Sequence, residues 1–370
     1  MFDQFVQDQP GLELVCQHLR QEPWIALDTE FVRERTYYAR LCLIQIATSD
    51  QLFCVDPLAT DDLSALLDVV YDSNIVKVLH SARQDLEVFY DLRGAAPAPV
   101  FDTQIASALL GYEDQIGYAA LVEELVGVKL DKLHTRTDWS TRPLAQEQLD
   151  YAADDVRHLV PIYRQLTEKL DELGRSDWVS EECARLTESG LYSNDPDYAH
   201  ERIKKGRTLL PANQQVLRAL ARWREHTAQK QNLPRSWVLR DTTLLELAAT
   251  QPSAREQLGS IKGIGAATLR KWGDDILKTI ANGQTMAPSS LWKKPIQLTR
   301  AQIELSHRML ALVKSCADER GISPALLATR KDVRALIRGE RDIALLTGWR
   351  RQVVGDTLLN MIKALPSSPQ

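Results

Sequence analysis

The sequence predicts an α/β domain, with a mixed sheet flanked by helices, followed by two all-α domains. Strand and helix signals alternate through the first third of the chain, which is typical of a sheet covered by helices. From Gly117 onward the pattern is helical. Two segments rich in turn residues, at 190–213 and 283–295, interrupt the helical part. We therefore expect three domains, at residues 1–195, 208–288 and 296–368.

Four apolar runs in the first third predict the strands of the sheet. They lie at residues 24–31, 41–47, 51–55 and 75–79. The turn Thr48-Ser49-Asp50 joins the second and third runs, so we expect a hairpin there. Helical spacing over 61–71 and 83–92 predicts the helices that flank the sheet.

The rest of the chain predicts helices and no strands. One helix is expected over residues 145–173, where a glycine follows. Residues 190–213 read as a linker. Several short helices are expected over 211–283, and residues 300–365 are again helical.

The charge is divided unevenly along the chain. Residues 1–200 contain 16 Lys and Arg against 36 Asp and Glu, whereas residues 201–370 contain 29 against 14. An acidic half that holds cations and a basic half that holds phosphates would suit a nucleic-acid enzyme. Two oppositely charged surfaces that attract each other are the simpler alternative. In the basic half, Arg222 and Arg224 are candidate phosphate contacts.

Composition also excludes several classes of protein. No apolar run is long enough to span a membrane, and no secretory signal is visible. The five cysteines are scattered and none forms a CxxC pair, so zinc frameworks and disulfides are not expected. A reducing cytoplasm fits this cysteine usage best.

Asp28 and Glu30 at the end of the first predicted strand are the most informative residues of the chain. Residues two apart in a strand share one face and lie about 6–7 Å apart. Two unpaired carboxylates on a core strand are costly unless a cation or protons compensate them. The pair therefore predicts a metal site.

Two later segments supply the remaining candidates. Asp85 lies in the first turns of the helix after the fourth strand. Tyr151 and Asp155 are four residues apart, so they lie on one face of a helix, and Asp154 is rotated away from them. Each signal alone is common on protein surfaces. The evidence lies in their combination and order: two acidic residues on the first strand, an aspartate after a later strand, and then a tyrosine and an aspartate four residues apart on a helix.

This order of motifs resembles the DEDD superfamily of 3′–5′ exonucleases, in the branch whose last motif carries tyrosine. The segments at 25–33, 35–38, 80–89 and 139–144 resemble the ribonuclease D family more closely. The segment at 217–265 resembles the HRDC domain, and residues 321–330 resemble a second, more divergent HRDC-like unit. The resemblance implies a ribonuclease H-like exonuclease domain followed by two HRDC-like helical domains.

The resemblance also implies that Asp28, Glu30, Asp85 and Asp155 hold two divalent ions, Mg²⁺ or Mn²⁺. Oxygen ligands suit such hard cations. Asp28 is expected to contact both ions, Glu30 and Asp155 the ion on the nucleophile side, and Asp85 the second ion through water. Tyr151 is a poor base near neutral pH, so we expect it to orient the attacking water.

Five further residues are candidate substrate contacts. The family uses positions such as Thr29 and Phe31 near the terminal nucleotide, with Phe31 stacking on a base. His80, Trp139 and Arg142 would border the substrate groove. A satisfied histidine at a strand end, a packed tryptophan and a salt-bridged arginine explain these three equally well.

The activity implied is removal of nucleotides one at a time from RNA 3′ ends, with release of nucleoside 5′-monophosphates. The implied substrates are tRNA precursors and other structured RNAs with 3′ extensions. One alternative is the same chemistry on single-stranded DNA, and a less favoured one is a non-catalytic RNA-binding adaptor. All four carboxylates are present, which argues against the adaptor. We expect a monomer in the cytoplasm.

Overall fold

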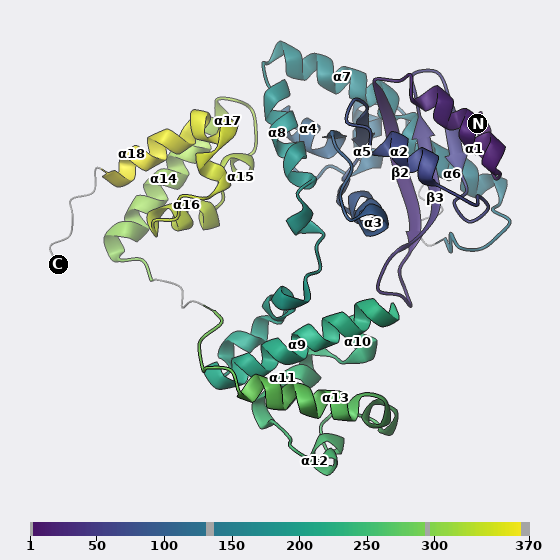
Figure 1. Cartoon of the computed structure of the whole chain (residues 1–370). Helices are drawn as coiled ribbons and strands as arrows, with labels where there is room; N and C mark the ends of the chain where they lie inside the picture. Colours follow the sequence, from purple (N-terminus) through teal and green to yellow (C-terminus); the bar gives the residue numbers. More distant parts are fainter. Residues whose placement is uncertain (1–2, 131–136, 293–296, 364–370) are drawn as a thin grey trace. The chain divides into compact units, whose positions relative to one another are not determined.

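The computed structural model describes residues 3–130, 137–292 and 297–363. Its N-terminal part contains a six-stranded mixed sheet with the order β1-β4-β3-β2-β5-β6. Figure 1 shows strands β2 and β3 of this sheet with helices beside them. β1 pairs in parallel with β4, β4 runs antiparallel to β3, and β5 runs parallel to both β2 and β6. The strands are β1 (Gln4–Val6), β2 (Trp24–Val32), β3 (Arg40–Ala47), β4 (Leu52–Val55), β5 (Val76–Leu79) and β6 (Val100–Asp102).

The mixed sheet predicted from the sequence is confirmed, and its four predicted strands correspond to β2, β3, β4 and β5. The two edge strands, β1 and β6, were not predicted. Each has three residues, which is too short for a period-two pattern to stand out from a loop. Their pairing depends on contact with β4 and β5, which are distant in the sequence.

Eight helices accompany this sheet in the described residues. α6 packs against β2 and β4, α8 packs against β6, and α1 packs against α2. The helices are α1 (Gln9–Leu19), α2 (Ser64–Val70), α3 (Arg83–Arg93), α4 (Thr103–Leu109), α5 (Tyr118–Val126), α6 (Gln146–Arg157), α7 (Leu159–Glu172) and α8 (Ser176–Leu186), followed by the 3₁₀ turn η1 (Ser189–Leu191).

The single helix predicted over 145–173 is wrong, because the structure divides it into α6 and α7 at His158. Pro161 lies two residues after the start of α7. It has no N–H to donate, and its ring would clash with the carbonyl group of Arg157 if the helix were continuous. The break ends α6 shortly after Asp155.

The chain divides into two compact units, which we call unit 1 and unit 2. Unit 1 comprises Met1–Val32, Leu41–Leu191 and Ile296–Gln370. Unit 2 comprises Arg33–Arg40 and Tyr192–Pro295. The predicted division into three domains, with boundaries at 195, 208, 288 and 296, stays a prediction.

Unit 2 contains two long helices, α9 and α13, that pack against each other. The sequence predicted short helices throughout this region, so that expectation is wrong for these two. The predicted linker at 190–213 is also wrong in part, because it contains 3₁₀ turns that bury Ala199 and Ile203 in the core. The elements are η2 (Pro196–Arg202), η3 (Lys204–Thr208), α9 (Pro211–Gln231), α10 (Arg235–Val238), α11 (Asp241–Thr250), α12 (Arg255–Gly259) and α13 (Ala266–Gln284).

A buried carboxylate, Glu225 of α9, organises unit 2. Its side chain is 1% exposed and accepts hydrogen bonds from Arg235 at 2.6 and 2.7 Å, from Arg202 at 3.3 Å and from the Tyr37 hydroxyl. Tyr37 belongs to the β2–β3 connection, and its amide donates to the Asn232 side chain at 3.0 Å. The connection that follows Asp28 and Glu30 in the sequence therefore contributes to the core of unit 2.

The C-terminal segment of unit 1 is helical and shares an apolar core with α4, α5, α7 and α8. Leu166 of α7 and Met309 of α14 belong to one cluster of buried residues. Trp178 and Trp349 stack at 4.5 Å, and the Trp349 indole N–H donates to Glu182 at 2.8 Å. The elements are α14 (Arg300–Asp318), α15 (Pro324–Leu327), α16 (Arg330–Ile337), η4 (Ala344–Leu346), α17 (Gly348–Arg350), the π-helical turn η5 (Arg351–Gly355) and α18 (Asp356–Lys363).

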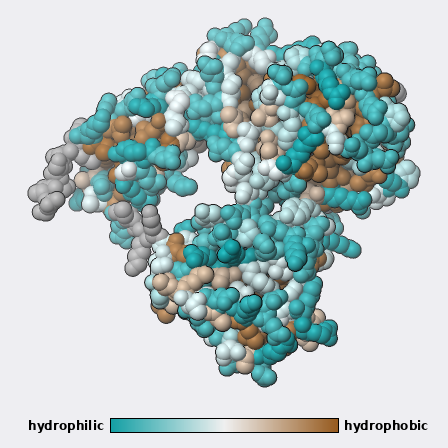
Figure 2. Space-filling model, viewed as in Figure 1, coloured by the Kyte–Doolittle hydropathy of each residue, from teal (hydrophilic) through white to brown (hydrophobic). Residues whose placement is uncertain are grey.

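Hydrophilic residues make up most of the visible surface of unit 2 (Figure 2). Across residues 3–130, 137–292 and 297–363, no helix combines the length and apolar character needed to cross a membrane.

Glu225→Gln is expected to lower the free energy of unfolding of unit 2 by about 2 kcal/mol, because it leaves Arg235 and Arg202 without a charged partner. Burial raises the pKa of Glu225, but the hydrogen bonds from Arg235 and Tyr37 outweigh it and hold that pKa below its usual value. Hydrogen exchange of α9 amides measures the effect. The matched control is Asp197→Asn. Asp197 forms an ion pair with Arg222 in which both side chains are more than half exposed, so this substitution should change the exchange rates little.

Candidate active site

The alternation of side chains along β2 places the first two carboxylates. Ala26 packs with the buried residues of α6, Ala152 and Ala153 among them. Asp28 and Glu30 follow Ala26 at intervals of two, so they lie on the same face of the strand. The sheet face covered by α6 therefore carries both carboxylates.

Asp155 of α6 completes a compact acidic group with Asp28 and Glu30. One carboxylate oxygen from each of the three residues lies within 4.8 Å of the others. Asp155 can reach β2 because α6 packs directly against this strand. The structure thus brings together residues that are more than 120 positions apart in the sequence.

Asp85 approaches the group from α3, where Thr29 holds it. The Thr29 amide and hydroxyl both donate to Oδ1 of Asp85, at 3.2 and 2.6 Å. Thr29 is 6% exposed and alternates with Asp28 and Glu30 along β2. A single strand therefore supplies two carboxylates with its side chains and fixes a third through the residue between them.

A further aspartate, Asp102, supports the turn that leads to Asp85. Its carboxylate accepts hydrogen bonds from the amides of Ser81 at 3.2 Å and Ala82 at 2.8 Å, and it also caps α4. Ser81 has a φ of 57°, a left-handed conformation that costs free energy in a residue other than glycine. The bonds to Asp102 stabilise that turn, and α3 begins two residues after Ser81.

Tyr151 lies on α6 one turn before Asp155. Its ring stacks on Trp139 with centroids 6.3 Å apart and an interplanar angle of 27°. Trp139 is 5% exposed, so it is a packed support for the tyrosine ring. Burial, followed by the charges of Asp155 and Glu30, raises the pKa of Tyr151 to about 12. The phenol is therefore protonated near neutral pH.

The carboxylates are difficult to ionise together. Burial raises the pKa of Glu30 to about 8 and of Asp155 to about 7, and neighbouring carboxylates add to both shifts. Burial and the three other carboxylates raise the pKa of Asp28 well above its usual value. Burial also raises the pKa of Asp85 to about 6, against the opposing effect of the Thr29 hydrogen bonds. Cations would relieve this repulsion, and the all-oxygen donor set fits hard divalent ions.

The predicted substrate contacts have different surroundings. Both ring nitrogens of His80 are engaged, with the Thr103 hydroxyl at 2.9 Å and the Ile116 carbonyl at 3.0 Å. Arg142 donates to both carboxylate oxygens of Asp56, at 2.6 and 2.8 Å. These contacts match the structural alternatives given above: a histidine with satisfied hydrogen bonds, a salt-bridged arginine and a packed tryptophan. Their contact with substrate stays a prediction.

Phe31 follows Glu30 on β2 and is partly exposed. Thr29 is the other predicted neighbour of the terminal nucleotide. Its hydroxyl donates a hydrogen bond to Asp85. Arg224, a candidate phosphate contact, is 4% exposed and donates to Asp241 at 2.6 Å, so that interpretation is wrong. Arg222 pairs with Asp197 at 2.8 Å and stays largely exposed.

Tyr118 of α5 supports the site and was not among the residues predicted from the sequence. Its hydroxyl donates to the backbone carbonyl of Asp154 at 2.8 Å, and its ring lies against His80 at 5.6 Å. Burial, followed by the charges of Asp155 and Asp28, raises its pKa well above the usual value. Tyr118 therefore positions α6 beside the acidic group. A lone tyrosine after a glycine carries no local signal for such a role.

Comparison with known proteins agrees with this geometry. Residues 4–171 match a family model described as 3′–5′ exonuclease, and residues 213–280 match the HRDC domain. Ribonuclease D of Gluconacetobacter diazotrophicus is 41% identical over 350 residues, covering 93% of this chain and 89% of the relative. Ribonuclease D of Pseudomonas paraeruginosa is 36% identical and covers 98% of both chains.

Solved structures give the same result. The crystal structure of Escherichia coli RNase D, described as an exoribonuclease involved in structured RNA processing, matches with a TM-score of 0.87 and 31% identity. The match covers 99% of this chain and all of the other. The catalytic core of RRP6 from Trypanosoma brucei matches with a TM-score of 0.59 and 27% identity, over 75% of this chain and 79% of the other.

Glu30→Gln should change how the stability of the metal-free protein depends on pH. A pKa raised on folding, here to about 8, means that the folded state binds more protons than the unfolded state. The wild type should therefore lose stability as pH rises from about 5 to 8, and the variant should lose less. With EDTA present, we expect the variant to melt roughly 3 °C or more above the wild type at pH 8.

Thermal unfolding followed by circular dichroism at pH 5 and pH 8 measures this difference. The matched control is Glu147→Gln, because Glu147 is an exposed glutamate on α6. Identical pH slopes for the wild type and Glu30→Gln would contradict the electrostatic account of the site.

Proposed function

The chain belongs to the ribonuclease D family of 3′–5′ exoribonucleases, and on that basis we propose how its acidic site acts on RNA. The protein is a metal-dependent hydrolase that shortens RNA from the 3′ end. The observation that supports the assignment of its residues is the grouping of Asp28, Glu30 and Asp155 within 4.8 Å, beside Asp85.

We propose that these four carboxylates hold two divalent ions, Mg²⁺ or Mn²⁺. Asp28 would reach both ions, Glu30 and Asp155 the ion on the nucleophile side, and Asp85 the second ion. When bound, the ions polarise the phosphate, favour ionisation of the attacking water and stabilise the departing oxygen. The Oδ1 atom of Asp85 already accepts two hydrogen bonds from Thr29, which agrees with a less direct role for this residue.

In the reaction, the oxygen of water bonds to the terminal phosphorus and the bond to the preceding 3′ oxygen breaks. The products are a nucleoside 5′-monophosphate and an RNA shortened by one nucleotide, with a free 3′ hydroxyl group. Tyr151 orients the attacking water by a hydrogen bond and does not act as its base, because the phenol keeps its proton. Trp139 holds the tyrosine ring by stacking, which fixes the direction of that hydrogen bond.

The proposed substrates are the 3′ ends of tRNA precursors and other structured RNAs. Phe31 would stack on the terminal base, and its partial exposure next to Glu30 supports this proposal. The basic composition of residues 201–370 supports a role for the helical regions in binding the RNA body. We further propose that the protein acts as a monomer in the cytoplasm.

Tyr151→Phe should lower kcat by about 100-fold while divalent ions still bind, because it removes the hydroxyl group and leaves the carboxylates intact. Single-turnover hydrolysis and Mn²⁺ titration measure the two effects separately. Tyr163→Phe serves as the control, since Tyr163 packs against Trp24 and Phe101. Wild-type turnover in Tyr151→Phe would show that the hydroxyl is not needed.

RNA and DNA substrates test the choice of nucleic acid. A 3′-extended tRNA precursor should give a ladder of products one nucleotide apart and free 5′-monophosphates with Mg²⁺, and none with EDTA. Single-stranded DNA of the same sequence should be degraded much more slowly. Asp155→Asn should abolish hydrolysis while its circular dichroism stays native, since it removes a proposed metal ligand.

Each alternative has its own outcome in this assay. Equal rates on RNA and DNA would support a general 3′–5′ exonuclease. Binding of RNA without hydrolysis under any divalent ion would support an adaptor. Binding should weaken steeply between low and high salt if phosphate contacts dominate.

A further inference from the structure

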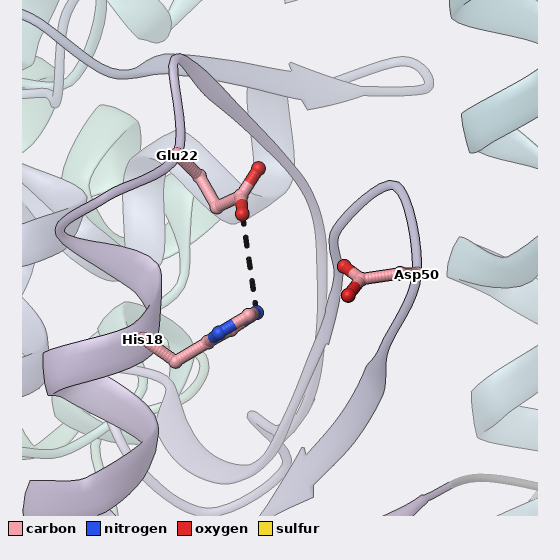
Figure 3. Close-up of side chains that lie close together, drawn as sticks. All are labelled: His18, Glu22 and Asp50. Carbon is pink, nitrogen blue, oxygen red and sulfur yellow. Dashed lines mark ion pairs between the residues drawn. The ribbon is translucent and has the colours of Figure 1, made fainter.

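A second group of potential metal ligands lies in unit 1, apart from the catalytic carboxylates. It comprises His18 in the last turn of α1, Glu22 in the connection to β2, and Asp50 in the turn between β3 and β4. Figure 3 shows the three side chains directed toward a common space from three segments of the chain. In the described residues, only this group and the catalytic one bring three such ligand atoms within 4.8 Å.

The central observation is the state of His18. The side chain is 31% exposed, but its Nε2 atom is buried and has no hydrogen-bond partner among the described residues. The nearest carboxylate oxygen, Oε1 of Glu22, is 4.0 Å away, which is too far for a hydrogen bond. A buried polar atom without a partner is costly, so this nitrogen calls for a ligand.

The spacing of the three atoms suits a metal ion. Ligand atoms around a tetrahedral ion at about 2.1 Å lie about 3.4 Å apart. The observed separations, 4.0 Å for His18 to Glu22 and at most 4.8 Å for all pairs, need small side-chain rotations to reach that value. One neutral imidazole and two carboxylates would also balance the charge of a divalent ion.

Contacts hold the side chains of His18 and Asp50 and the backbone of Glu22, whose amide donates to the Leu19 carbonyl at 3.1 Å. The Thr48 hydroxyl donates to Oδ1 of Asp50 at 2.9 Å, which leaves Oδ2 available. The turn itself is closed by the Thr48 amide, which donates to the Gln51 carbonyl at 2.8 Å. The His18 ring packs edge-on against Phe53 at 5.8 Å. The site is therefore ordered by the fold, as metal sites require.

We propose that His18, Glu22 and Asp50 bind a divalent transition-metal ion of the Zn²⁺ type. Imidazole nitrogen with carboxylate oxygen favours zinc and similar ions over Mg²⁺, which prefers oxygen ligands and water. Three protein ligands leave a fourth position for water. The bound ion would join α1, the connection from α1 to β2 and the β3–β4 turn, so it would stabilise this end of the sheet.

This site is independent of catalysis. Glu22 precedes β2, and Trp24 at the start of the strand is about 13 Å from Asp28 along an extended chain. The catalytic group contains no histidine. A response of an imidazole nitrogen to metal therefore reports binding at the second group and not at the catalytic one. A plain ion pair between protonated His18 and the two carboxylates is the competing explanation.

Nuclear magnetic resonance of the full-length protein, labelled with ¹⁵N in histidine, tests the proposal during titration with Zn²⁺. We expect the ring nitrogens of His18 to shift as for metal ligation at equimolar zinc, and the melting temperature to rise. His18→Gln should remove this signal and identify it. His307→Gln, a change at an exposed histidine of α14, should leave it in place.

Asp50→Asn gives a second test that does not depend on changing the histidine. Asp50 is exposed, so the variant should fold normally, and zinc affinity at His18 should fall by about tenfold or more. His18 resonances that do not respond to zinc, or that respond equally in Asp50→Asn, would overturn the proposal. Resonances of a protonated His18 at neutral pH, unchanged by zinc, would establish the ion pair instead.

Discussion

Repulsion among carboxylates in a partly buried site is the constraint on which the exonuclease fold depends. Asp28, Glu30 and Asp155 place oxygens within 4.8 Å of one another, and burial makes ionisation of each more difficult. Such a cluster opposes folding unless protons or cations neutralise it. The surrounding structure must therefore hold the carboxylates in place against their own repulsion.

Both faces of β2 contribute to that restraint. One face meets α6 through Ala26 and small alanines, which lets the helix approach closely enough to bring Asp155 to the strand. The opposite face presents Thr29, which fixes Asp85 through two hydrogen bonds. Asp102 stabilises the strained turn before α3. Residues that do not touch the reacting phosphate thus determine where the carboxylates lie.

The connection that follows β2 belongs to unit 2. The β2–β3 connection places Tyr37 in the core of unit 2, where it bonds with the buried Glu225 and lies under Arg235 at 4.7 Å. In unit 2 the buried carboxylate of Glu225 is paired with Arg235 and Arg202. In the catalytic site the buried carboxylates face one another. Burial raises the pKa of both glutamates; the charges of Asp155 and Asp85 raise that of Glu30 further, whereas hydrogen bonds from Arg235 and Tyr37 and the charges of Arg235 and Arg202 bring that of Glu225 below its usual value.

Local periodicity was enough to predict the central strands, the shared strand face of Asp28 and Glu30 and the shared helix face of Tyr151 and Asp155, because alternation and helical spacing are properties of neighbouring residues. That these residues form one acidic site was implied by the resemblance of their order to a known family. The edge strands β1 and β6 could be identified only in the folded chain. The same is true of the hydrogen bonds of Arg142 and His80, and of the contacts by which Tyr118 and Asp102 support the site. These features depend on contacts between distant segments, and such contacts leave no periodic trace in a single sequence.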